Sequence, residues 1–347
     1  MTPPASGGEA ARQRDIVVIG ASAGGVEALG TLTAGLPAEL GASVFVVLHV
    51  MSGGKSVLPQ ILSRKCALTV AAADDGEEIE RGQVYVAPPD HHMLIADGHV
   101  RLTHGPRENG HRPAVDPLFR SAARAFGRRV IGVVLSGALD DGTAGLRMIC
   151  EAGGVALVQD PAGALYPSMP ASALEHTPQA RAVPLGQLAD AICAAIDEPL
   201  GEDEPPSGNP IKSSPVAEPD RSDDDPRAGV LTALTCPECG GALWEHDEHG
   251  VIRFKCHVGH AYSSESLEAS QAESLEGALW AGLRSLQERA DLFNRLARRG
   301  RANERMREKA KVAEGHASVL RALVTSFGAE PGDAGEVPPP GARLEQA

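Results

Sequence analysis

Between residues 14 and 196 the sequence alternates short apolar runs with stretches of helical periodicity. The runs are apolar at successive positions and rich in valine and isoleucine, which is typical of strands that are buried on both faces. Because strands and helices alternate along the chain, we expect an α/β fold, a doubly wound and mainly parallel sheet that is covered by helices. The predicted strands are Asp15–Ile19, Val44–Leu48, Leu68–Ala71, Val84–Ala87, Val130–Leu135 and Val155–Val158, and the predicted helices are 25–35, 55–64, 116–126, 143–152, 170–175 and 185–196.

Two segments interrupt this alternation with hairpin-like patterns. One lies around Asp74–Asp90, and the other spans Met93–Thr103, with Asp97 and Gly98 as a turn signal. We therefore expect an antiparallel hairpin beside the parallel sheet.

The chain divides by composition into five parts. Residues 14–196 carry the α/β pattern, whereas residues 197–230 are rich in Pro, Ser, Gly and acidic residues. Such a composition cannot bury enough apolar surface to offset the entropy of ordering, so we expect a flexible acidic linker there. Residues 231–262 form a compact Cys/His segment, 263–328 a helical tract, and 329–347 a tail that we expect to be disordered.

Apolar residues recur at heptad spacing in two runs of the helical tract, on either side of Gly300. Two such runs around a glycine predict an antiparallel helical hairpin. Self-association, or a surface for a signalling partner protein, is the alternative. The apolar positions are Leu279, Leu283, Leu286, Ala290, Phe293 and Ala297, then Met306, Ala310, Ala313, Ala317, Leu320, Val324 and Phe327.

Composition narrows the classes of function. The formal net charge of −14 argues against general nucleic-acid binding, which needs a basic surface. No apolar run approaches the roughly 20 residues that span a bilayer, and the first residues contain no apolar core of a secretory signal. We therefore expect a cytoplasmic protein without membrane insertion. Three isolated cysteines, Cys66, Cys150 and Cys193, are expected to be small buried hydrophobes.

The first predicted strand runs directly into the turn Gly20-Ala21-Ser22-Ala23-Gly24, and a helical stretch follows. Such a turn holds a serine hydroxyl above the end of a strand and beside a helix N-terminus, where free N–H groups favour negative charge. Ser22 is therefore a candidate nucleophile or a ligand for an anion, and a plain structural turn is the third interpretation. A nucleotide-binding protein is disfavoured, because a dinucleotide fingerprint needs glycine at position 22.

Two further strand ends carry polar residues. His49 follows the second predicted strand, and Asp140 and Asp141 lie in the loop after the run that ends at Leu135. In open α/β sheets, ligands gather at the carboxyl ends of the strands. A hydroxyl, an imidazole and a carboxylate together meet the needs of nucleophilic acyl transfer. Either aspartate could orient the imidazole, and the loop could also be a simple turn and helix start.

Longer motifs accompany these strand ends. They are Ile19-Gly20-Ala21-Ser22-Ala23-Gly24-Gly25, Leu48-His49-Val50, Gly82-Gln83-Val84-Tyr85-Val86-Ala87-Pro88-Pro89-Asp90-His91-His92-Met93, His111-Arg112-Pro113-Ala114-Val115-Asp116-Pro117-Leu118-Phe119, Ser136-Gly137-Ala138-Leu139-Asp140-Asp141-Gly142, Gln159-Asp160 and Ser168-Met169-Pro170. In these motifs, residues 14–196 resemble the catalytic domain of the CheB-type chemotaxis protein-glutamate methylesterases. The resemblance implies Ser22 as nucleophile, His49 as general base and Asp141, which directly precedes a glycine, as the carboxylate that orients it.

The activity implied by this resemblance is that of a carboxylic ester hydrolase. The enzyme would hydrolyse glutamyl γ-methyl esters on the signalling helices of methylated chemoreceptors and release methanol, and family members also deamidate receptor glutamines. No cofactor is implied for catalysis. The backbone N–H groups of Ala23 and of the loop at Ala138 would stabilise the oxyanion.

The chain departs from the family at both of these positions. Thr is common where this chain has Ala23, and Met is frequent where it has Ala138. Regulated members begin with a receiver domain, and we expect that control to be absent. His111 and Arg112 could border the substrate cleft, where a guanidinium suits an acidic receptor surface, but a structural salt bridge of Arg112 is equally open. A regulatory or adaptor module without strong catalysis is the alternative function.

A second kind of chemistry is indicated by Cys236, Cys239 and Cys256, which cluster with histidines. Cys-x2-Cys followed by Cys-x3-His has the ligand spacing of a zinc ribbon, and a four-ligand site of this kind is structural. His257 is a rival fourth ligand, but adjacent side chains point apart, which favours His260. We therefore expect a structural Zn²⁺ in the 231–262 segment, which is too small to fold easily without one.

Overall fold

The computed structural model describes residues 13–50, 56–200, 225–248, 250–299 and 303–326. They belong to two compact units, Met1–Leu267 and Glu268–Ala347, which are described separately. The predicted linker lies mostly at 201–224 and the predicted disordered tail at 329–347, and both of these stretches are outside the described residues.

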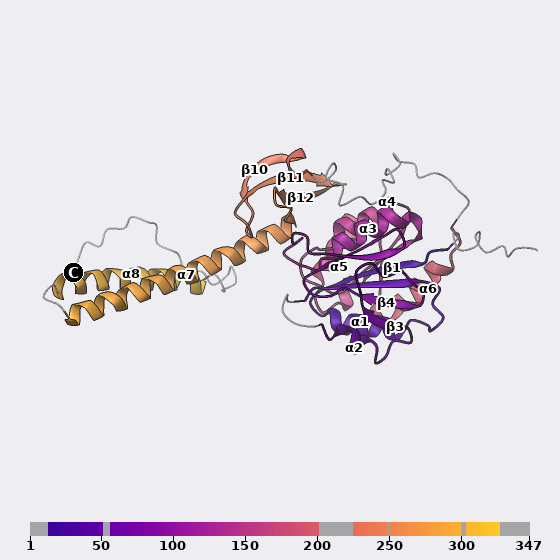
Figure 1. Ribbon diagram of the computed structural model, residues 1–347, viewed down its shortest axis with the longest axis horizontal. Helices are drawn as coiled ribbons and strands as arrows, with labels where there is room; N and C mark the ends of the chain where they lie inside the picture. Colours follow the sequence, from indigo (N-terminus) through magenta and orange to yellow (C-terminus); the bar gives the residue numbers. More distant parts are fainter. Residues whose placement is uncertain (1–12, 51–55, 201–224, 249, 300–302, 327–347) are drawn as a thin grey trace, which may run out of the picture. The chain divides into compact units, whose positions relative to one another are not determined.

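The larger unit is built on a sheet of seven described strands (Figure 1). These are β1 (Ile16–Ala21), β2 (Ser43–Leu48), β3 (Thr69–Ala72), β4 (Gln83–Val86), β7 (Val130–Val134), β8 (Val155–Gln159) and β9 (Arg181–Val183). Their order is β3-β4-β2-β1-β7-β8-β9, and every neighbouring pair is parallel. The expected doubly wound parallel sheet is thereby confirmed, with β1 at its centre.

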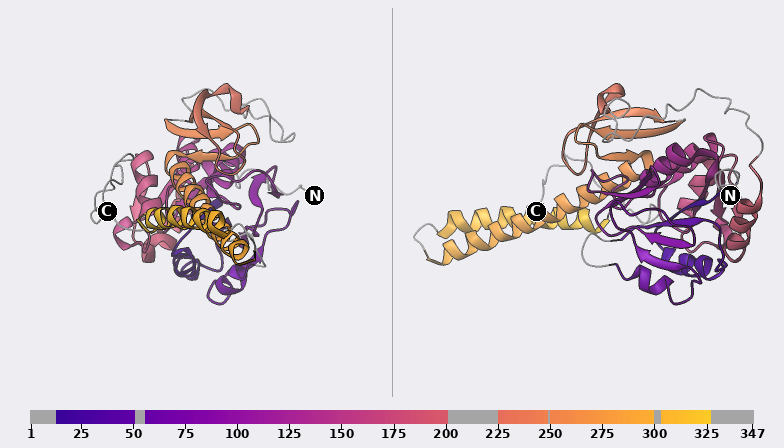
Figure 2. Two further views of the ribbon diagram at one scale, coloured as in Figure 1. Left: turned by 90° about the vertical axis from the view of Figure 1, so that its left-hand side faces the viewer. Right: turned by 45° about the vertical axis from the view of Figure 1, so that its right-hand side comes forward.

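Helices cover both faces of this sheet (Figures 1 and 2). They are α1 (Gly25–Ala34), α2 (Leu58–Leu62), α3 (Val115–Phe126), α4 (Thr143–Glu151), α5 (Ser168–His176) and α6 (Leu188–Asp197). The core under α1, α2 and α6 contains Val17 and Val44, whereas the core under α3, α4 and α5 contains Val18 and Phe45. Successive strand residues point to opposite faces, so burial on both faces explains why the runs are apolar at every position.

One of the two predicted hairpins is present. Strands β5 (His92–Ala96) and β6 (His99–Thr103) pair antiparallel around the turn at Asp97 and Gly98. Both residues have positive φ angles, which aspartate and glycine tolerate better than most residues. The hairpin packs on the α3 side of the main sheet through buried apolar residues.

The other hairpin, predicted around Asp74–Asp90, is wrong. Its second half, β4, joins the main sheet between β2 and β3, where Val84, Tyr85 and Val86 are buried. Its first half runs beside β6 instead, with the N–H of Gly76 donating to the carbonyl of Val100 over 2.9 Å. Apolar residues at successive positions in β4 need cover on both faces, which a two-stranded hairpin would not provide.

The remaining predicted strands and helices of this unit are present, with ends that differ by at most three residues. Strand β9 was not predicted, because it is a short and partly exposed edge strand without an apolar run. Short 3-10 turns complete the described part of the unit at Gly127–Arg129, Pro161–Gly163, Leu185–Gln187 and Pro226–Ala228.

The Cys/His segment forms a second, antiparallel sheet within the larger unit. Its strands are β10 (Val230–Thr235), β11 (Ala242–Glu248), β12 (Val251–Cys256) and β13 (Ala261–Ser263), in that order. A small core of its own contains Leu243, Phe254, Tyr262 and Leu267 together with Cys236 and Cys256. So few apolar side chains stabilise a sheet weakly, and a bound metal would add to them.

The smaller unit consists of α7 (Ser264–Arg299), whose first turn belongs to the larger unit, and α8 (Asn303–Ser326). Asn294 donates to Glu314 over 3.0 Å, and the ammonium of Lys309 lies over the ring of Phe293. Leu320 lies opposite Gly282 and Lys309 opposite Phe293, so the contacting position moves back along α8 as it moves forward along α7, and the predicted antiparallel hairpin is confirmed. Within it, seven heptad residues are buried, and Phe327 is outside the described residues; the buried ones are Leu283, Ala290, Ala297, Ala310, Ala313, Ala317 and Val324.

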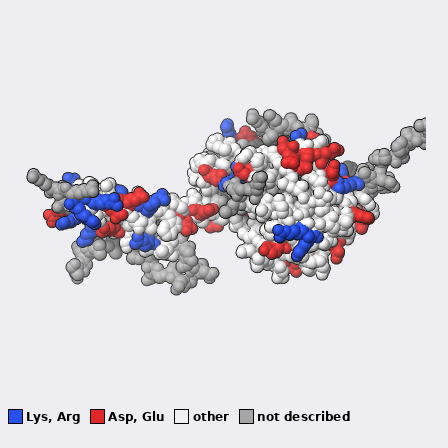
Figure 3. Space-filling view, turned by 60° about the horizontal axis from the view of Figure 1, so that its bottom comes forward, with Lys and Arg blue, Asp and Glu red and all other residues white. Residues whose placement is uncertain are grey.

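One face of the protein shows how its charged side chains are distributed. Figure 3 shows acidic and basic residues of the larger unit in small separate groups on a mostly uncharged face. This face offers no continuous basic area of the kind that binds nucleic acid. Among the described helices, none is both long and apolar enough to cross a membrane.

Candidate functional site

Three predicted site residues lie at the carboxyl edge of the main sheet, around its central strand. Ser22 directly follows β1, and His49 follows its neighbour β2. Asp141 lies in the loop after β7, the neighbour of β1 on the other side. The chain winds in opposite directions from β1, so these residues surround the switch point at which open α/β sheets bind ligands.

His49 joins the other two side chains by hydrogen bonds. Its Nδ1 is 3.0 Å from Ser22 Oγ, and its Nε2 is 2.7 Å from Asp141 Oδ2. An ionised carboxylate only accepts hydrogen bonds, so Nε2 carries the proton and the lone pair of Nδ1 faces the serine. In chymotrypsin the two nitrogens have the opposite roles. The arrangement can accept a proton from the hydroxyl of Ser22.

Asp141 is buried and surrounded by donors. Its Oδ2 also accepts from the N–H of Val115 (2.7 Å), and its Oδ1 accepts from Asn109 Nδ2 (2.8 Å) and from the N–H of Asp116 (3.2 Å). The two N–H groups belong to the first turn of α3, whose dipole favours an anion. Burial tends to raise the pKa of Asp141, but His49 and these donors outweigh burial and hold the pKa below its usual range. Asp141 is therefore ionised and able to orient His49.

Asp140, the alternative carboxylate, has a different partner. Its Oδ1 accepts a hydrogen bond of 2.6 Å from the hydroxyl of Ser263, the last residue of β13. Burial raises the pKa of Asp140 to about 6, although this hydrogen bond works in the opposite direction. The structure thus brings Asp141 and not Asp140 to His49.

The turn that carries Ser22 packs tightly on the loop after β7. The N–H of Ser22 donates to the carbonyl of Ser136 (3.0 Å), and Ser136 Oγ donates to the carbonyl of Ala23 (2.9 Å). Gly24 has a φ of 71°, a conformation that glycine adopts without strain. A Cβ at Gly137 would lie 2.9 Å from the Cβ of Ser22. Two glycines therefore let the serine approach both a helix N-terminus and the neighbouring loop.

Ala23 and Ala138 both lie beside Ser22. Ala23 follows the serine at the start of α1, and Ala138 follows Gly137, which contacts the serine. Within the described part of the chain, no hydrogen bond uses the N–H of either alanine. Unpaired N–H groups at such a place can hold a developing negative charge.

His111 borders this site directly. Its ring stacks on that of His49, with centroids 3.7 Å apart and 15° between the planes. Burial, and then the neighbouring His49, lower the pKa of His111 to about 4. The neutral ring therefore covers one face of His49 without placing a second positive charge beside it.

Arg112 is engaged in a salt bridge instead of facing the serine. Its Nε and Nη2 donate to Asp90 Oδ1 over 3.0 and 2.7 Å, and its Nη1 donates to the carbonyl of Gly105 over 2.6 Å. These contacts correspond to the structural alternative for Arg112, and a role in substrate binding stays a prediction.

Two buried residues that were not predicted support the site. Asn109 donates to Asp141, and Arg253 forms an ion pair of 2.6 Å with Asp116, the neighbour of Val115 in α3. Asn109 precedes Gly110, and such a pair of residues by itself indicates only a turn. Arg253 carries a signal that could have been used, because alternation in β12 places it on the same face as the buried Val251.

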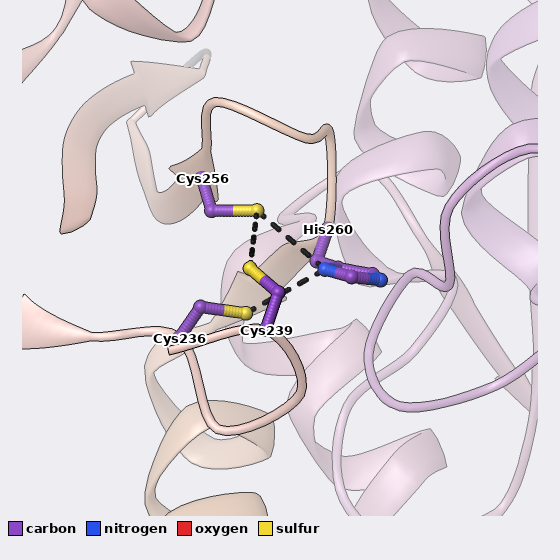
Figure 4. A group of neighbouring side chains, drawn as sticks. All are labelled: Cys236, Cys239, Cys256 and His260. Carbon is purple, nitrogen blue, oxygen red and sulfur yellow. Dashed lines mark hydrogen bonds between the residues drawn. The ribbon is translucent and has the colours of Figure 1, made fainter. Parts of the chain in front are cut away.

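The four predicted metal ligands come together in the second sheet. Figure 4 shows the side chains of Cys236, Cys239, Cys256 and His260 directed at one point. Their ligand atoms all lie within 4.8 Å of one another. Cys239 Sγ is 3.7 Å from Cys256 Sγ, and His260 Nδ1 is 3.6 Å from Cys236 Sγ and 3.5 Å from Cys256 Sγ.

Two turns and an outer carboxylate support this cluster. The N–H of Gly240 donates to the carbonyl of Cys236 (2.8 Å), and that of Gly259 donates to the carbonyl of Cys256 (2.9 Å). The other ring nitrogen of His260 is 3.2 Å from a carboxylate oxygen of Glu238. A carboxylate at that nitrogen is typical of histidines that ligate metals. His257, the rival ligand, is exposed and is not part of the cluster.

The sequence is similar to curated proteins that are named as protein-glutamate methylesterases. A relative from Leptospira interrogans is 41% identical over 164 residues, which are 47% of this chain and 85% of the relative. Relatives from Anaeromyxobacter dehalogenans and Pseudomonas aeruginosa, each named protein-glutamate methylesterase/protein-glutamine glutaminase 2, are both 39% identical. The aligned regions are 51% and 55% of this chain and 52% and 55% of those two relatives, so only about half of each is matched.

The fold is also similar to a solved structure. The crystal structure of the Thermotoga maritima CheB methylesterase catalytic domain is 34% identical, with a TM-score of 0.50, and covers 52% of this chain and 97% of the solved one. A family model described as CheB methylesterase matches residues 17–192, just over half of the chain. The chain therefore belongs to the CheB methylesterase family.

Proposed function

We propose that this protein is a protein-glutamate methylesterase, a carboxylic ester hydrolase that acts on glutamyl γ-methyl esters of methylated chemoreceptors. The observation that carries the proposal is the pair of hydrogen bonds by which His49 joins Ser22 to Asp141. Membership of the CheB methylesterase family and the names of the relatives support the same reaction.

In the first half of the reaction, Ser22 Oγ attacks the carbonyl carbon of the ester. His49 Nδ1 takes the hydroxyl proton, and Asp141 stabilises the imidazolium through the proton on Nε2. The carbonyl oxygen becomes an oxyanion, which the N–H groups of Ala23 and Ala138 stabilise; one such donor contributes about 3 kcal/mol in acyl-transfer enzymes. His49 then protonates the leaving methoxide, and methanol departs from an acyl-enzyme.

In the second half, water attacks the acyl-enzyme while His49 Nδ1 takes one of its protons. Collapse of the second tetrahedral intermediate returns the proton to Ser22 and releases glutamate. A receptor glutamine can follow the same course with ammonia as the leaving group, which accounts for a glutaminase activity. Both reactions need only protein groups and water. Because the N–H groups act through the backbone, alanine at positions 23 and 138 is compatible with catalysis.

The test is the release of methanol from a receptor carrying radiolabelled methyl esters. The wild-type chain should release methanol, and Ser22→Ala should reduce the rate at least a thousandfold, since the nucleophile is lost. Equal release by both proteins would refute the role of Ser22. Binding of receptor without release by the wild type would favour the adaptor function.

We infer that Cys236, Cys239, Cys256 and His260 bind a structural Zn²⁺. Ligands about 2.3 Å from a tetrahedral zinc stand about 3.7 Å apart. Three separations in the cluster are 3.5–3.7 Å, and all four ligand atoms lie within 4.8 Å of one another. Four protein ligands leave no position for substrate, so the metal would stabilise the small sheet and take no part in the reaction. The carboxylate of Glu238 on His260 supports this inference.

The metal is tested by elemental analysis of the purified chain. We expect one zinc per chain, and its loss from the double variant Cys236→Ser, Cys256→Ser. Cys150→Ser is the matched control, because Cys150 lies in α4 and should leave the zinc content unchanged. Retention of metal by the double variant would rule out this site.

A further inference from the structure

The Cys/His segment is joined to the catalytic part of the chain by backbone hydrogen bonds next to a proposed metal ligand. Ala261 directly follows His260 and is the first residue of β13. Its carbonyl accepts from the N–H of Asn109 over 2.7 Å, and its N–H donates to the carbonyl of Arg107 over 3.2 Å. The stretch before Asn109 thus pairs with β13 through a parallel bridge between Glu108 and Ala261.

The side chain of Asn109 continues this link to the catalytic site. Its amide nitrogen donates to Asp141 Oδ1 (2.8 Å) and to Asp116 Oδ2 (3.1 Å). Its amide oxygen accepts from the N–H of Ser263 (3.0 Å) and from Ser266 Oγ (3.0 Å). The amide nitrogen therefore bonds to carboxylates of the catalytic part, and the amide oxygen bonds to residues at the end of β13 and in the first turn of α7, which directly follow the Cys/His segment. Asn109 is 4% exposed, so water does not replace these partners.

Arg253 places a positive charge beside the carboxylates of Asp116 and Glu108. Its guanidinium, 1% exposed, lies 2.6 Å from Asp116 Oδ2 and 3.1 Å from a carboxylate oxygen of Glu108. Asp116 and Asp141 are two buried carboxylates that both accept hydrogen bonds from the amide nitrogen of Asn109. Negative charges on two neighbouring carboxylates repel each other. Burial raises the pKa of Asp116 and Arg253 opposes this effect, so the ion pair with Arg253 offsets part of the cost of burying the carboxylate and holds its oxygens in place.

We propose that the Cys/His segment is a structural part of the active site: through Asn109 and Arg253 it positions Asp141, so that reactivity of Ser22 depends on metal at Cys236, Cys239, Cys256 and His260. This proposal rests on the proposed function in one respect, the role of Ser22 as nucleophile. Asn109 and Arg253 are positioning residues, because neither touches the serine. The path from metal to carboxylate is short. His260 precedes Ala261, whose carbonyl accepts a hydrogen bond from the N–H of Asn109. The side chain of Asn109 then donates to Asp141.

The test measures the rate at which a fluorophosphonate labels Ser22 in the full-length chain, with Ser22→Ala as the blank. A chelator that removes the zinc should slow labelling at least tenfold, and added Zn²⁺ should restore it. Equal rates with and without metal, with metal loss verified by elemental analysis, would overturn the proposal. The fluorophosphonate does not need the receptor, so labelling without methanol release would contradict only the proposed substrate.

A spectroscopic readout separates positioning from general unfolding. The proton between His49 Nε2 and Asp141 should give a downfield NMR resonance, assigned by its loss in His49→Gln. On metal removal we expect this resonance to shift or broaden, while methyl resonances of Ile131 and Leu157 in the sheet core stay in place. An unchanged downfield resonance in the metal-free chain would count against the proposal.

A pair of matched variants settles the case in which metal removal unfolds the whole unit. Ser266→Ala removes the hydroxyl that donates to Asn109, whereas Ser264→Ala removes an exposed hydroxyl in the same helical turn. In the zinc-loaded chain, Ser266→Ala removes this hydrogen bond together with the hydroxyl's hydrogen bonds to Ser263, so it should slow labelling by roughly three- to tenfold or more, and Ser264→Ala should not change it. Identical rates for these two variants would contradict the proposed link. Arg253→Lys should retain more labelling than Arg253→Met, because only lysine keeps the charge.

Discussion

The two oxygens of Asp141 have different partners, and this division determines what a substitution does. Oδ2 accepts the proton of His49 Nε2, while Oδ1 is held by Asn109 and by the N–H of Asp116. Every one of these partners is a donor. A substituted side chain with an N–H group in place of Oδ1 or Oδ2 would therefore face another hydrogen-bond donor. The tautomer of His49 would then no longer be fixed.

Asp141→Asn should lower kcat by about 10³- to 10⁴-fold with little change in KM, because asparagine favours the wrong tautomer of His49. The measurement is the initial rate of methanol release at several receptor concentrations. Asp97→Asn is the matched control, since Asp97 lies in the β5–β6 turn and should keep full activity. A loss of less than tenfold in Asp141→Asn would show that the carboxylate is not needed to orient the base.

Strand β1 and helix α3 approach each other closely beside the site. A Cβ built on Gly20 would overlap the side chain of Val115, the first residue of α3. The same residue donates its N–H to Asp141. The close approach of β1 to α3 therefore helps to set the position of the Asp141 carboxylate.

Gly20→Ala should reduce the free energy of unfolding by about 1–3 kcal/mol, because the added methyl group overfills this contact. It should also lower kcat, since Val115 must move away from the strand. Gly30→Ala is the matched control: Gly30 lies in α1 with open space where its Cβ would be, and alanine there should stabilise by roughly 0.5–1 kcal/mol. Urea unfolding followed by circular dichroism measures the free energy of unfolding of both variants. If both substitutions changed the free energy of unfolding in the same direction, the proposed tight contact between Gly20 and Val115 would be refuted.

Most elements of the main sheet could be predicted because their apolar runs report burial on both faces. The runs at β1, β2 and β7 also located Ser22, His49 and the loop with Asp141, since polar residues at strand ends mark the functional edge. The apolar pattern did not predict β9, which is short and partly exposed. It also placed β4 in a hairpin with the residues before it, whereas β4 pairs with β2 and β3 in the main sheet. Local periodicity contains no information about which distant strand becomes the partner.

The residues that connect the two sheets could not be predicted in the same way. Arg253 owes its role to contacts with Glu108, Asn109 and Asp116, which lie 137 to 145 positions earlier in the sequence, and Asn109 in turn donates to Asp141. A buried arginine in an apolar strand does signal an acidic partner, but it does not identify Asp116 or Glu108. The clustering of Cys236, Cys239, Cys256 and His260, by contrast, could be predicted, because the spacing of these residues in the sequence is typical of a set of metal ligands.

At the scale of the whole molecule, two buried groups give stability opposite dependences on pH. Burial raises the pKa of Asp140 to about 6 from its ordinary value of 3.8, so the folded state binds more protons between these two values, and stability falls as pH rises through them. Burial lowers the pKa of His111 to about 4 from 6.5, so stability rises with pH over an overlapping window. Their effects therefore partly cancel near pH 5.

Asp140→Asn should separate the two contributions. Asparagine can still accept from Ser263, but it carries no charge, so the variant should be more stable than the wild type by up to roughly 3 kcal/mol above pH 7. The difference should shrink as pH falls below about 6 and be nearly absent at about pH 3, below both pKa values. Urea unfolding at a series of pH values measures it. A constant difference across this range would show that ionisation of Asp140 is not its cause.

The nitrogen by which His49 faces Ser22 also decides how the protein reacts with affinity labels. An alkylating agent that occupies the ester site meets the lone pair of Nδ1, because Nε2 is covered by Asp141. After hydrolysis, amino-acid analysis should yield the histidine derivative substituted at the ring nitrogen nearer the main chain. A serine protease of the chymotrypsin type would yield the other isomer, so one chromatographic comparison distinguishes the two geometries without any structure.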